Sequence, residues 1–286
     1  MRHQLKTRFV KKSKGKISRL TFGSSGSKAA SQESLPGAQS YSGLDEDKVA
    51  QKYLRKIAHQ KFCVDIAASD GTSASNTRAL FEKGWEGLAA EFDGEKFAKL
   101  ATSYALFSGA RLSRNKITPE NVIPLLKAHG TPKKFGFLSL DIDSYDYFVL
   151  AKILSEFRPA LICAEINEKI PPPLKFTVKW IPGHWWSGDH FYGQSICQLH
   201  TLASRYKYDL VELHYNNAFL IPSELNPFGS LTPEAAFQKG YAGKKDREIK
   251  FPWNKNVDFL LELSPVEARK SIDHLFREYR GKYELK

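Results

Sequence analysis

The sequence has few sulfur-containing residues and no long hydrophobic run. It contains three cysteines and one methionine in 286 residues. Cys63, Cys163 and Cys197 are widely spaced in apolar surroundings, without the spacing of a metal or redox site, and so predict buried thiols in a reducing compartment. No apolar run approaches the roughly 20 residues that span a bilayer, which argues against a transmembrane protein. We therefore expect a cytoplasmic protein, with import into an organelle as the alternative.

Acidic residues are absent from the first 32 positions, which contain nine Lys or Arg. The formal net charge of +12 comes mostly from this segment, because the rest of the chain has 34 basic and 31 acidic residues. A basic, Ser/Gly-rich segment is typical of a solvated tail, but contact with anionic lipid, attraction to a polyanionic partner and a transit peptide are alternatives. The nearly neutral remainder argues against a large nucleic-acid-binding surface.

We divide the chain into a basic leader and linker (1–43), one folded domain (44–223) and a C-terminal extension packed on it (224–286). Apolar runs alternate with helical patterns. The runs lie at 62–66, 87–92, 136–142 and 160–165, with a weaker one at 109–113, and the helical patterns lie near 74–84, 94–104, 119–129, 145–157 and 194–206. Parallel strands need such helical crossovers, so we expect an α/β, Rossmann-like fold with a mainly parallel sheet and helices on both faces. Two apolar runs joined by Asn216 and Asn217 predict an antiparallel hairpin at the sheet edge.

A glycine-rich phosphate-binding loop is also missing. The loop after the first predicted strand contains only Gly71, whereas a dinucleotide site needs G-x-G-x-x-G, and Asp70 in the same loop disfavours phosphate. Asp65 and Glu91 end consecutive strands and should face one crevice, where the Glu91 carboxylate suits the hydroxyls of a ribose. These features favour a cationic nucleoside without phosphates, such as S-adenosylmethionine, over a nicotinamide cofactor.

Several separated segments resemble one enzyme family. VDIAASDG and GLAAEFD resemble the first two motifs of class I S-adenosylmethionine-dependent methyltransferases. KITPENVIPLL, FGFLSLDIDSYDYFVL, RPALICAEIN and GDHFYGQS resemble the FkbM-like branch in order and spacing. The resemblance runs from about residue 60 to 222 and implies a seven-stranded sheet and S-adenosylmethionine as cofactor. Ala67 and Ser144 replace two glycines of the family pattern, which leaves a non-catalytic scaffold with this fold as an alternative.

The resemblance also implies which residues contact the cofactor. The first loop would line the methionine end, Glu91 would hold the ribose, and Phe92 would lie beside the adenine. The loop after the third strand, which includes Asn115, would meet the edge of the base, and Asp141 would close the crevice beneath the sulfonium. The residues assigned in this way are Asp65, Ala67, Ser69, Asp70, Gly71, Glu91, Phe92, Ser113, Arg114 and Asp141.

Acidic side chains also follow the two next strands, in DIDSYD (141–146) and AEIN (164–167). Oxygen ligands at adjacent strand ends predict a divalent metal site, for example for magnesium, that binds a diol and lowers the pKa of one hydroxyl. The metal ligands would be Asp141, Asp143 and Glu165. Helix capping and loop hydrogen bonding are the alternative explanation of these acids.

The segment 182–193 interleaves aromatic and polar residues, as a sugar-binding cleft does, although aromatic residues in a loop also anchor it over a core. His190 is the first candidate for general base, followed by His184, with Asp143 as a further catalytic candidate. The acceptor-binding candidates are Glu165, Asn167, Trp185, Trp186, Asp189 and Tyr192. We expect O-methylation of a carbohydrate or other small molecule, and an RNA methyltransferase that uses the basic leader as an electrostatic arm is the alternative.

Overall fold

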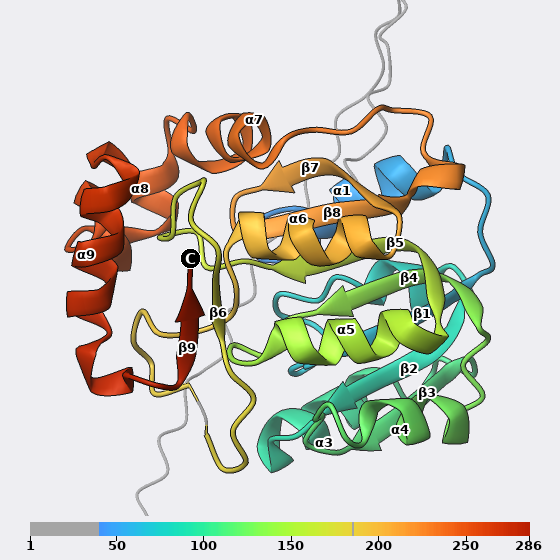
Figure 1. Ribbon diagram of the computed structural model, residues 1–286. Coiled ribbons are helices and arrows are strands. Elements are labelled where there is room, and N and C mark those ends of the chain that lie inside the picture. The colour runs from blue at the N-terminus through green and yellow to red at the C-terminus, as the bar shows by residue number, and fades with distance from the viewer. Residues whose placement is uncertain (1–39, 185) are drawn as a thin grey trace, which may run out of the picture. The chain divides into compact units, whose positions relative to one another are not determined.

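The computed structural model describes residues 40–184 and 186–286, which are built around one seven-stranded sheet (Figure 1). From edge to edge the strands are β3 (Ala110–Arg114), β2 (Glu86–Glu91), β1 (Phe62–Ile66), β4 (Lys134–Leu140), β5 (Arg158–Glu165), β8 (Asn217–Pro222) and β7 (Tyr208–His214). Strand β8 runs antiparallel to β5 and β7, and the other neighbouring pairs are parallel. The predicted fold class, an α/β, Rossmann-like fold with a mainly parallel seven-stranded sheet and an antiparallel C-terminal hairpin, is confirmed.

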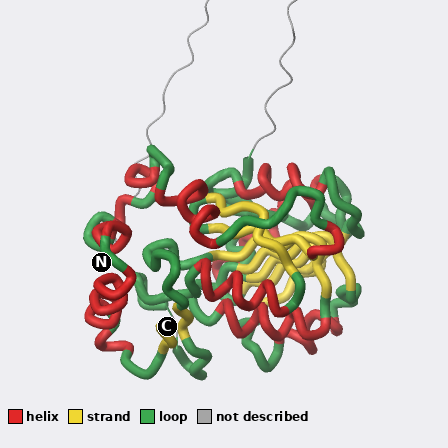
Figure 2. Tube along the Cα trace, turned by 45° about the horizontal axis from the view of Figure 1, so that its top comes forward, coloured by secondary structure: helices red, strands yellow, loops and turns green. Residues whose placement is uncertain are grey.

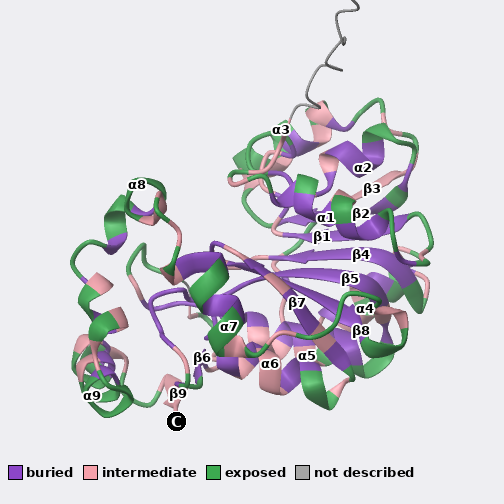
Figure 3. Cartoon of the chain, turned by 90° about the horizontal axis from the view of Figure 1, so that it is seen from above, coloured by how far each residue is buried: buried purple, intermediate pink, exposed green. Residues whose placement is uncertain are grey.

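Helices cover both faces of this sheet, because the strand residues alternate between two hydrophobic cores. Val64 and Ile66 of β1 belong to the core under α4 (Val122–Ala128), α5 (Asp146–Glu156) and α6 (Ile196–Arg205). Cys63 belongs to the opposite core, under α1 (Glu46–Leu54), α2 (Arg78–Glu82) and α3 (Gly94–Ser103). Figure 2 shows the strands between two layers of helices, and Figure 3 shows that the strands are buried along most of their length. This double cover explains why the central strands are apolar on both faces.

Helix α2 is shorter than the predicted helix at 74–84, since it begins only at Arg78. The Asp70 carboxylate accepts hydrogen bonds from the backbone N–H groups of Thr72 and Ser73 at 2.8 and 2.7 Å, which folds this stretch into a loop. Ala74 then has a φ of 58°, in the left-handed region, which a continuous helix does not contain. The loop is therefore longer than the helical pattern suggested.

The C-terminal segment forms a second, smaller layer with strands that the sequence did not predict. Strand β9 (Tyr283–Leu285) pairs antiparallel with β6 (Phe176–Val178). A third hydrophobic cluster joins them to α9 (Pro265–Leu275) and includes Phe176, Phe191 and Phe276. The remaining elements are α7 (Pro233–Phe237), α8 (Arg247–Lys250), a π-helical turn at Gln238–Ala242 and 3₁₀ turns at Ser223–Leu225, Pro252–Asn254, Asp258–Glu262 and Arg277–Tyr279. This layer brings the end of the chain beside residues 170–193 (Figure 1).

Among the described residues, no helix combines the length and apolar character needed to cross a membrane. The basic leader lies almost entirely outside the described residues, so the predictions for it stay as stated.

Candidate active site

A pocket of about 390 Å³ lies where β1, β2 and β4 end, at the carboxyl edge of the parallel strands. We call it the strand-end pocket. Its wall includes Ala67, Ser69, Glu91, Phe92, Asp141 and Asp143. This is the position at which open α/β sheets bind their ligands, because the loops that leave adjacent strands there enclose a crevice.

Glu91 ends β2 and is buried, and its carboxylate is held by three backbone N–H groups. Oε1 accepts hydrogen bonds from Phe92 and Asp93, each at 2.7 Å, and Oε2 accepts one from Ser69 at 2.8 Å. A carboxylate has about four lone-pair directions, so it can still accept from a ligand. The bond from Ser69 also ties the loop after β1 to the end of β2, which gives the pocket a fixed acidic wall.

Three of the residues assigned to the cofactor, Asp65, Asp70 and Gly71, do not line the pocket. The Asp65 carboxylate is buried and accepts a hydrogen bond from Oγ1 of Thr77 at 2.5 Å, and its burial raises the pKa to about 6. Asp70 binds the backbone of its own loop, as described above. A Cβ on Gly71 would lie 2.5 Å from Cδ1 of Leu100, so this glycine packs against α3. Ala67 and Ser69, in the loop after β1, line the pocket.

The part of the pocket that we assigned to the adenine from the sequence is formed by Phe92 and by the segment that follows β3. The Phe92 ring lines the pocket and is 48% exposed. Asn115, Lys116 and Ile117 contribute the wall after β3, whereas Ser113 and Arg114 do not line the pocket. Ser113 is buried and accepts a hydrogen bond from Nδ2 of Asn115 at 2.7 Å, so it orients that side chain.

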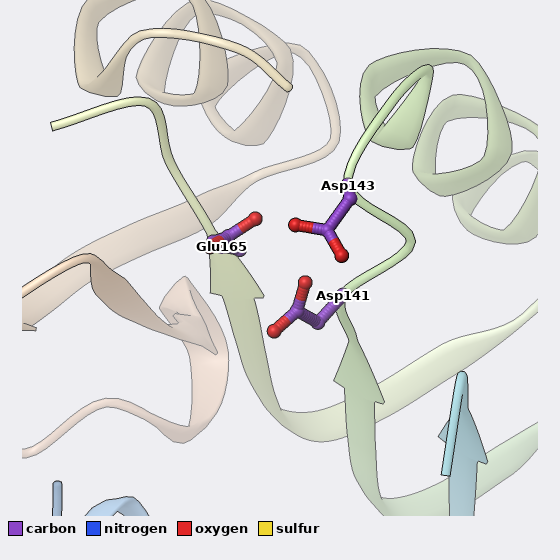
Figure 4. Close-up of side chains that lie close together, drawn as sticks. All are labelled: Asp141, Asp143 and Glu165. Carbon is purple, nitrogen blue, oxygen red and sulfur yellow. The ribbon is translucent and has the colours of Figure 1, made fainter. Parts of the chain in front are cut away.

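Three carboxylates meet beside the strand-end pocket, and we call them the carboxylate cluster (Figure 4). Asp141 and Asp143 follow β4, and Glu165 ends β5. One oxygen of each side chain lies within 4.8 Å of one oxygen of both others. Asp146 shapes the turn, because its carboxylate accepts hydrogen bonds from the backbone N–H groups of Ile142 and Ser144 at 2.9 and 3.1 Å. The structure therefore brings together the three residues that the sequence proposed as metal ligands.

The position of the carboxylate cluster disfavours ionisation of its three carboxyl groups. Burial, and then the neighbouring Asp143, raise the pKa of Asp141, and burial raises the pKa of Asp143. Burial, followed by Asp141, raises the pKa of Glu165 well above its usual range. Oε1 of Glu165 accepts a hydrogen bond from Nδ2 of Asn216 at 2.8 Å, whereas Oε2 is buried without a hydrogen-bond partner. Concentrated negative charge of this kind is stabilised by a proton or by a cation.

A second pocket of about 450 Å³ begins on the other side of the carboxylate cluster. We call it the aromatic pocket. It is lined by Asp143, Glu165, Lys169, Trp186, Gly188, Asp189, His190, Tyr192, Asn216, Phe251 and Trp253. Asp143 lines both pockets, so the cluster lies at their junction. Four of the predicted acceptor-binding residues, Glu165, Trp186, Asp189 and Tyr192, lie on this wall, as does the predicted base His190.

The His190 ring is held by the C-terminal extension. Its Nε2 lies 3.1 Å from Oδ1 of Asn256, and because that oxygen only accepts, Nε2 carries the proton and Nδ1 keeps a lone pair. Burial, and then the Lys169 ammonium, lower the pKa of His190. The imidazole is therefore neutral near pH 7 and able to accept a proton.

Three other predicted acceptor or base residues are not on this wall. His184 lines a different pocket, beside Ser187 and Tyr279. Asn167 is buried, and its Nδ2 donates to the carbonyl oxygens of His190 and Tyr192 at 2.9 Å each, so it holds the loop rather than facing the pocket. Trp185 lies outside the described residues.

Sequence reasoning missed a buried ionic network beside the aromatic pocket. The Lys169 ammonium lies 2.9 Å from Oε1 of Glu168 and donates to the Tyr192 hydroxyl at 2.6 Å. The Tyr192 hydroxyl donates to Oε2 of Glu168 at 2.7 Å, and Nδ2 of Asn254 donates to Oε1 at 2.6 Å. Glu168 and Lys169 directly follow the apolar stretch ALICAEIN, and this charged pair could have indicated the network from the sequence. No pattern in the sequence indicated that Phe251, Trp253 and Asn256 lie beside this pocket, since only the C-terminal layer brings them there.

No family model matches the chain, and no curated protein matches it in sequence. Solved structures with a similar fold include methyltransferases. The glycopeptide N-methyltransferase MtfA, complexed with S-adenosylmethionine, is 13% identical over 61% of this chain and 85% of its own, with a TM-score of 0.37. The N-terminal domain of EvdMO1 with bound S-adenosylhomocysteine is 12% identical over 63% and 79%, with a TM-score of 0.41. An S-adenosylmethionine-dependent methyltransferase from Clostridium acetobutylicum is 9% identical over 62% and 89%, with a TM-score of 0.38. At this level of similarity, the activity of the chain has to be argued from its own side chains.

Proposed function

We propose that this protein is an S-adenosylmethionine-dependent methyltransferase of the FkbM-like branch that methylates a hydroxyl group of a carbohydrate or another small molecule. The observation that carries the proposal is the buried Glu91 carboxylate, which is fixed by three backbone N–H groups on the wall of the strand-end pocket. When bound, S-adenosylmethionine would supply an electrophilic methyl group on a sulfonium.

The strand-end pocket suits a cationic nucleoside. Four acids, Glu91, Asp93, Asp141 and Asp143, line it against two lysines, Lys96 and Lys116, and this excess of acids favours a sulfonium and an amino group over phosphates. One acceptor position remains, on Oε2 of Glu91, and it can take a hydrogen bond from one hydroxyl of a ribose. The Phe92 ring offers an apolar face to the adenine. Asp141 would face the sulfonium from the side of the carboxylate cluster.

The aromatic pocket suits the acceptor. Trp186 and Trp253 line it and are 42% and 59% exposed, so their rings can stack on the apolar face of a sugar. Nδ1 of His190 would take the proton of the acceptor hydroxyl while the oxygen attacks the methyl carbon. The C–S bond of the sulfonium breaks as the C–O bond forms, and a neutral thioether leaves. Asn256 would keep the His190 ring in the required tautomer.

Isothermal titration calorimetry of S-adenosylhomocysteine into the full chain tests the cofactor site. We expect binding to wild type and a loss of roughly fivefold to 150-fold in Glu91→Ala, since leaving buried polar groups unpaired costs about 1–3 kcal/mol. Glu86→Ala is the matched control, because Glu86 begins the same strand at its other end, on the surface, where it pairs with Arg111. The control should bind as wild type does.

Two outcomes would contradict the proposal. Equal binding by wild type and Glu91→Ala would place the ligand elsewhere. Absence of binding to wild type would favour the non-catalytic scaffold, because the methyl group of Ala67 stands on the pocket wall where the family pattern has a glycine.

A further inference from the structure

The carboxylate cluster has more negative charge than its surroundings compensate. Among the described residues, no Lys, Arg or His nitrogen lies within 4.0 Å of an oxygen of Asp141, Asp143 or Glu165. Lys169 lines the same pocket as two of them, but its ammonium is bound by Glu168 and Tyr192. Lys96 and Lys169 favour the ionised form of Asp143 from beyond contact distance, so the described residues compensate the charge of the cluster only in part.

An independent observation identifies a vacant ligand position. Oε2 of Glu165 has no hydrogen-bond partner, and the Glu165 side chain is only 7% exposed. An unpaired carboxylate oxygen at such a depth costs free energy unless a partner binds it. Figure 4 shows the three carboxylates converging on one space between the ends of β4 and β5.

The chemistry of the donors selects the partner. Carboxylate oxygens are the ligands that Mg²⁺ and Mn²⁺ prefer, and three of them leave coordination positions open for water or substrate. The cluster adjoins both pockets, so a bound ion would reach oxygens of the acceptor in the aromatic pocket and remain beside the strand-end pocket.

We propose that Asp141, Asp143 and Glu165 bind one divalent cation of the Mg²⁺ or Mn²⁺ type, and that this cation chelates two adjacent oxygens of the acceptor, which is a vicinal diol. The second part rests on the proposed function. Coordination lowers the pKa of the chelated hydroxyls, so that the proton moves from one of them to Nδ1 of His190 before its oxygen takes the methyl group. The second hydroxyl remains coordinated and fixes which oxygen is methylated.

Mn²⁺ titration followed by electron paramagnetic resonance tests the cation site directly and needs no acceptor. The full chain is treated with EDTA, exchanged into metal-free buffer and titrated with MnCl₂. We expect loss of the free-ion signal to saturate at about one ion per chain, with Mg²⁺ competing. Asp143→Asn and Glu165→Gln should each weaken Mn²⁺ binding by more than about tenfold.

Asp93→Asn is the matched control. Asp93 lines the strand-end pocket outside the cluster, and its Oδ1 caps α3 by accepting from Glu95 and Lys96, which an asparagine also does. It should keep the wild-type Mn²⁺ affinity. Thermal unfolding shows whether the cluster variants fold: without metal they should melt no lower than wild type, because each removes like-charge repulsion, and only wild type and the control should gain stability from Mn²⁺. Equal Mn²⁺ binding by wild type and both cluster variants would overturn the cation site, as would no binding to wild type.

A pair of small molecules tests the diol. In the Mn²⁺-loaded protein with S-adenosylhomocysteine, cis-1,2-cyclohexanediol should change the spectrum of the bound ion at a concentration where cyclohexanol does not. Chelation of the acceptor would be overturned if the spectrum of the bound ion changed equally with both compounds, or with neither of them. S-adenosylhomocysteine binding without Mn²⁺ binding would refute the cation alone, whereas loss of S-adenosylhomocysteine binding would refute the proposed function, so the two failures are distinguishable.

Discussion

The backbone N–H of Ala67 donates a hydrogen bond to the carbonyl oxygen of Ala90 at 3.0 Å, and the next N–H, of Ala68, donates to the same oxygen at the same distance. The two bonds turn the chain at the end of β1 across the end of β2, which brings Ala67 and Glu91 to the same pocket. They also hold Ala67 at a φ of 67°, in the left-handed region. A glycine adopts this conformation without steric cost, whereas an alanine is strained there.

Ala67→Gly should therefore stabilise the protein by roughly 0.5–1 kcal/mol, because the relief of left-handed strain exceeds the added entropy of the unfolded chain. Ala68→Gly is the matched control. Ala68 is buried and outside the left-handed region, so the same substitution should destabilise by about 1 kcal/mol. Urea unfolding of the three proteins checks both signs. A loss of stability in Ala67→Gly would show that the loop tolerates its alanine without strain.

Gly71 and Gly84 both have positive φ values, of 71° and 74°, but they differ in how much space a side chain would have. A Cβ on Gly71 would lie 2.5 Å from Cδ1 of Leu100 and 2.7 Å from Cε1 of Tyr104, whereas a Cβ on Gly84 would meet nothing within 4 Å. We expect Gly71→Ala to destabilise by about 3 kcal/mol from strain and overpacking together, and Gly84→Ala by about 1 kcal/mol from strain alone. Equal losses in urea unfolding would mean that α3 moves aside.

The parallel part of the fold was predictable because each β-strand and helix carries its own periodic signal. Strand β1 has the predicted bounds, and the hairpin at Asn216 and Asn217 is present. Strands β6 and β9 have three residues each and lie far apart in the sequence, and they pair where the third hydrophobic cluster brings them together, so no local pattern marked them. The helix predicted at 74–84 begins late because Ala74 is in the left-handed region and the N–H of Ser75 donates to the carbonyl oxygen of Tyr41, two features that the apolar pattern does not reveal.

The candidate site was predictable where residues end adjacent parallel strands. Strand order alone places Glu91, Asp141 and Glu165 at one edge, and the carboxylate cluster follows from it. The direction of loop side chains does not follow from strand order. His184 and His190 are six positions apart in one loop, and only the tertiary contacts made by Asn256 and Tyr279 place them in different pockets.

Asp65 should make the protein less stable as the pH rises. Burial raises its pKa to about 6 in the folded state from 3.8, so between these values the folded state holds a proton that the unfolded state has lost. The free energy of unfolding should fall across this window by on the order of 2–3 kcal/mol. Asp65→Asn should remove the part of the fall that Asp65 causes and be the more stable protein at pH 8, because an amide oxygen still accepts from Thr77.

Asp70 should have the opposite pH dependence to Asp65, and urea unfolding at a series of pH values measures both. Although burial opposes the change, the backbone N–H groups of Thr72 and Ser73 lower the pKa of Asp70. The contribution of the ionised Asp70 carboxylate to stability is therefore present above the unfolded pKa and is lost as the pH falls, so Asp70→Asn should reduce stability at pH 7.

An unchanged pH profile in Asp65→Asn would show that Asp65 ionises as freely in the folded protein as in the unfolded chain.

His190 should titrate below the ordinary range of histidine, and Asn256→Ala should lower its pKa further. Burial and the Lys169 ammonium disfavour the imidazolium, whereas the hydrogen bond to Asn256 favours it, so removing that bond takes away one of the favourable contributions. NMR titration of the ring nitrogens measures the change. The pKa of His184, which burial also lowers, is the internal control and should not respond to Asn256→Ala. A His190 pKa above 7 would leave the ring cationic at neutral pH without a lone pair for a proton, and the assignment of His190 as the base would fall with it.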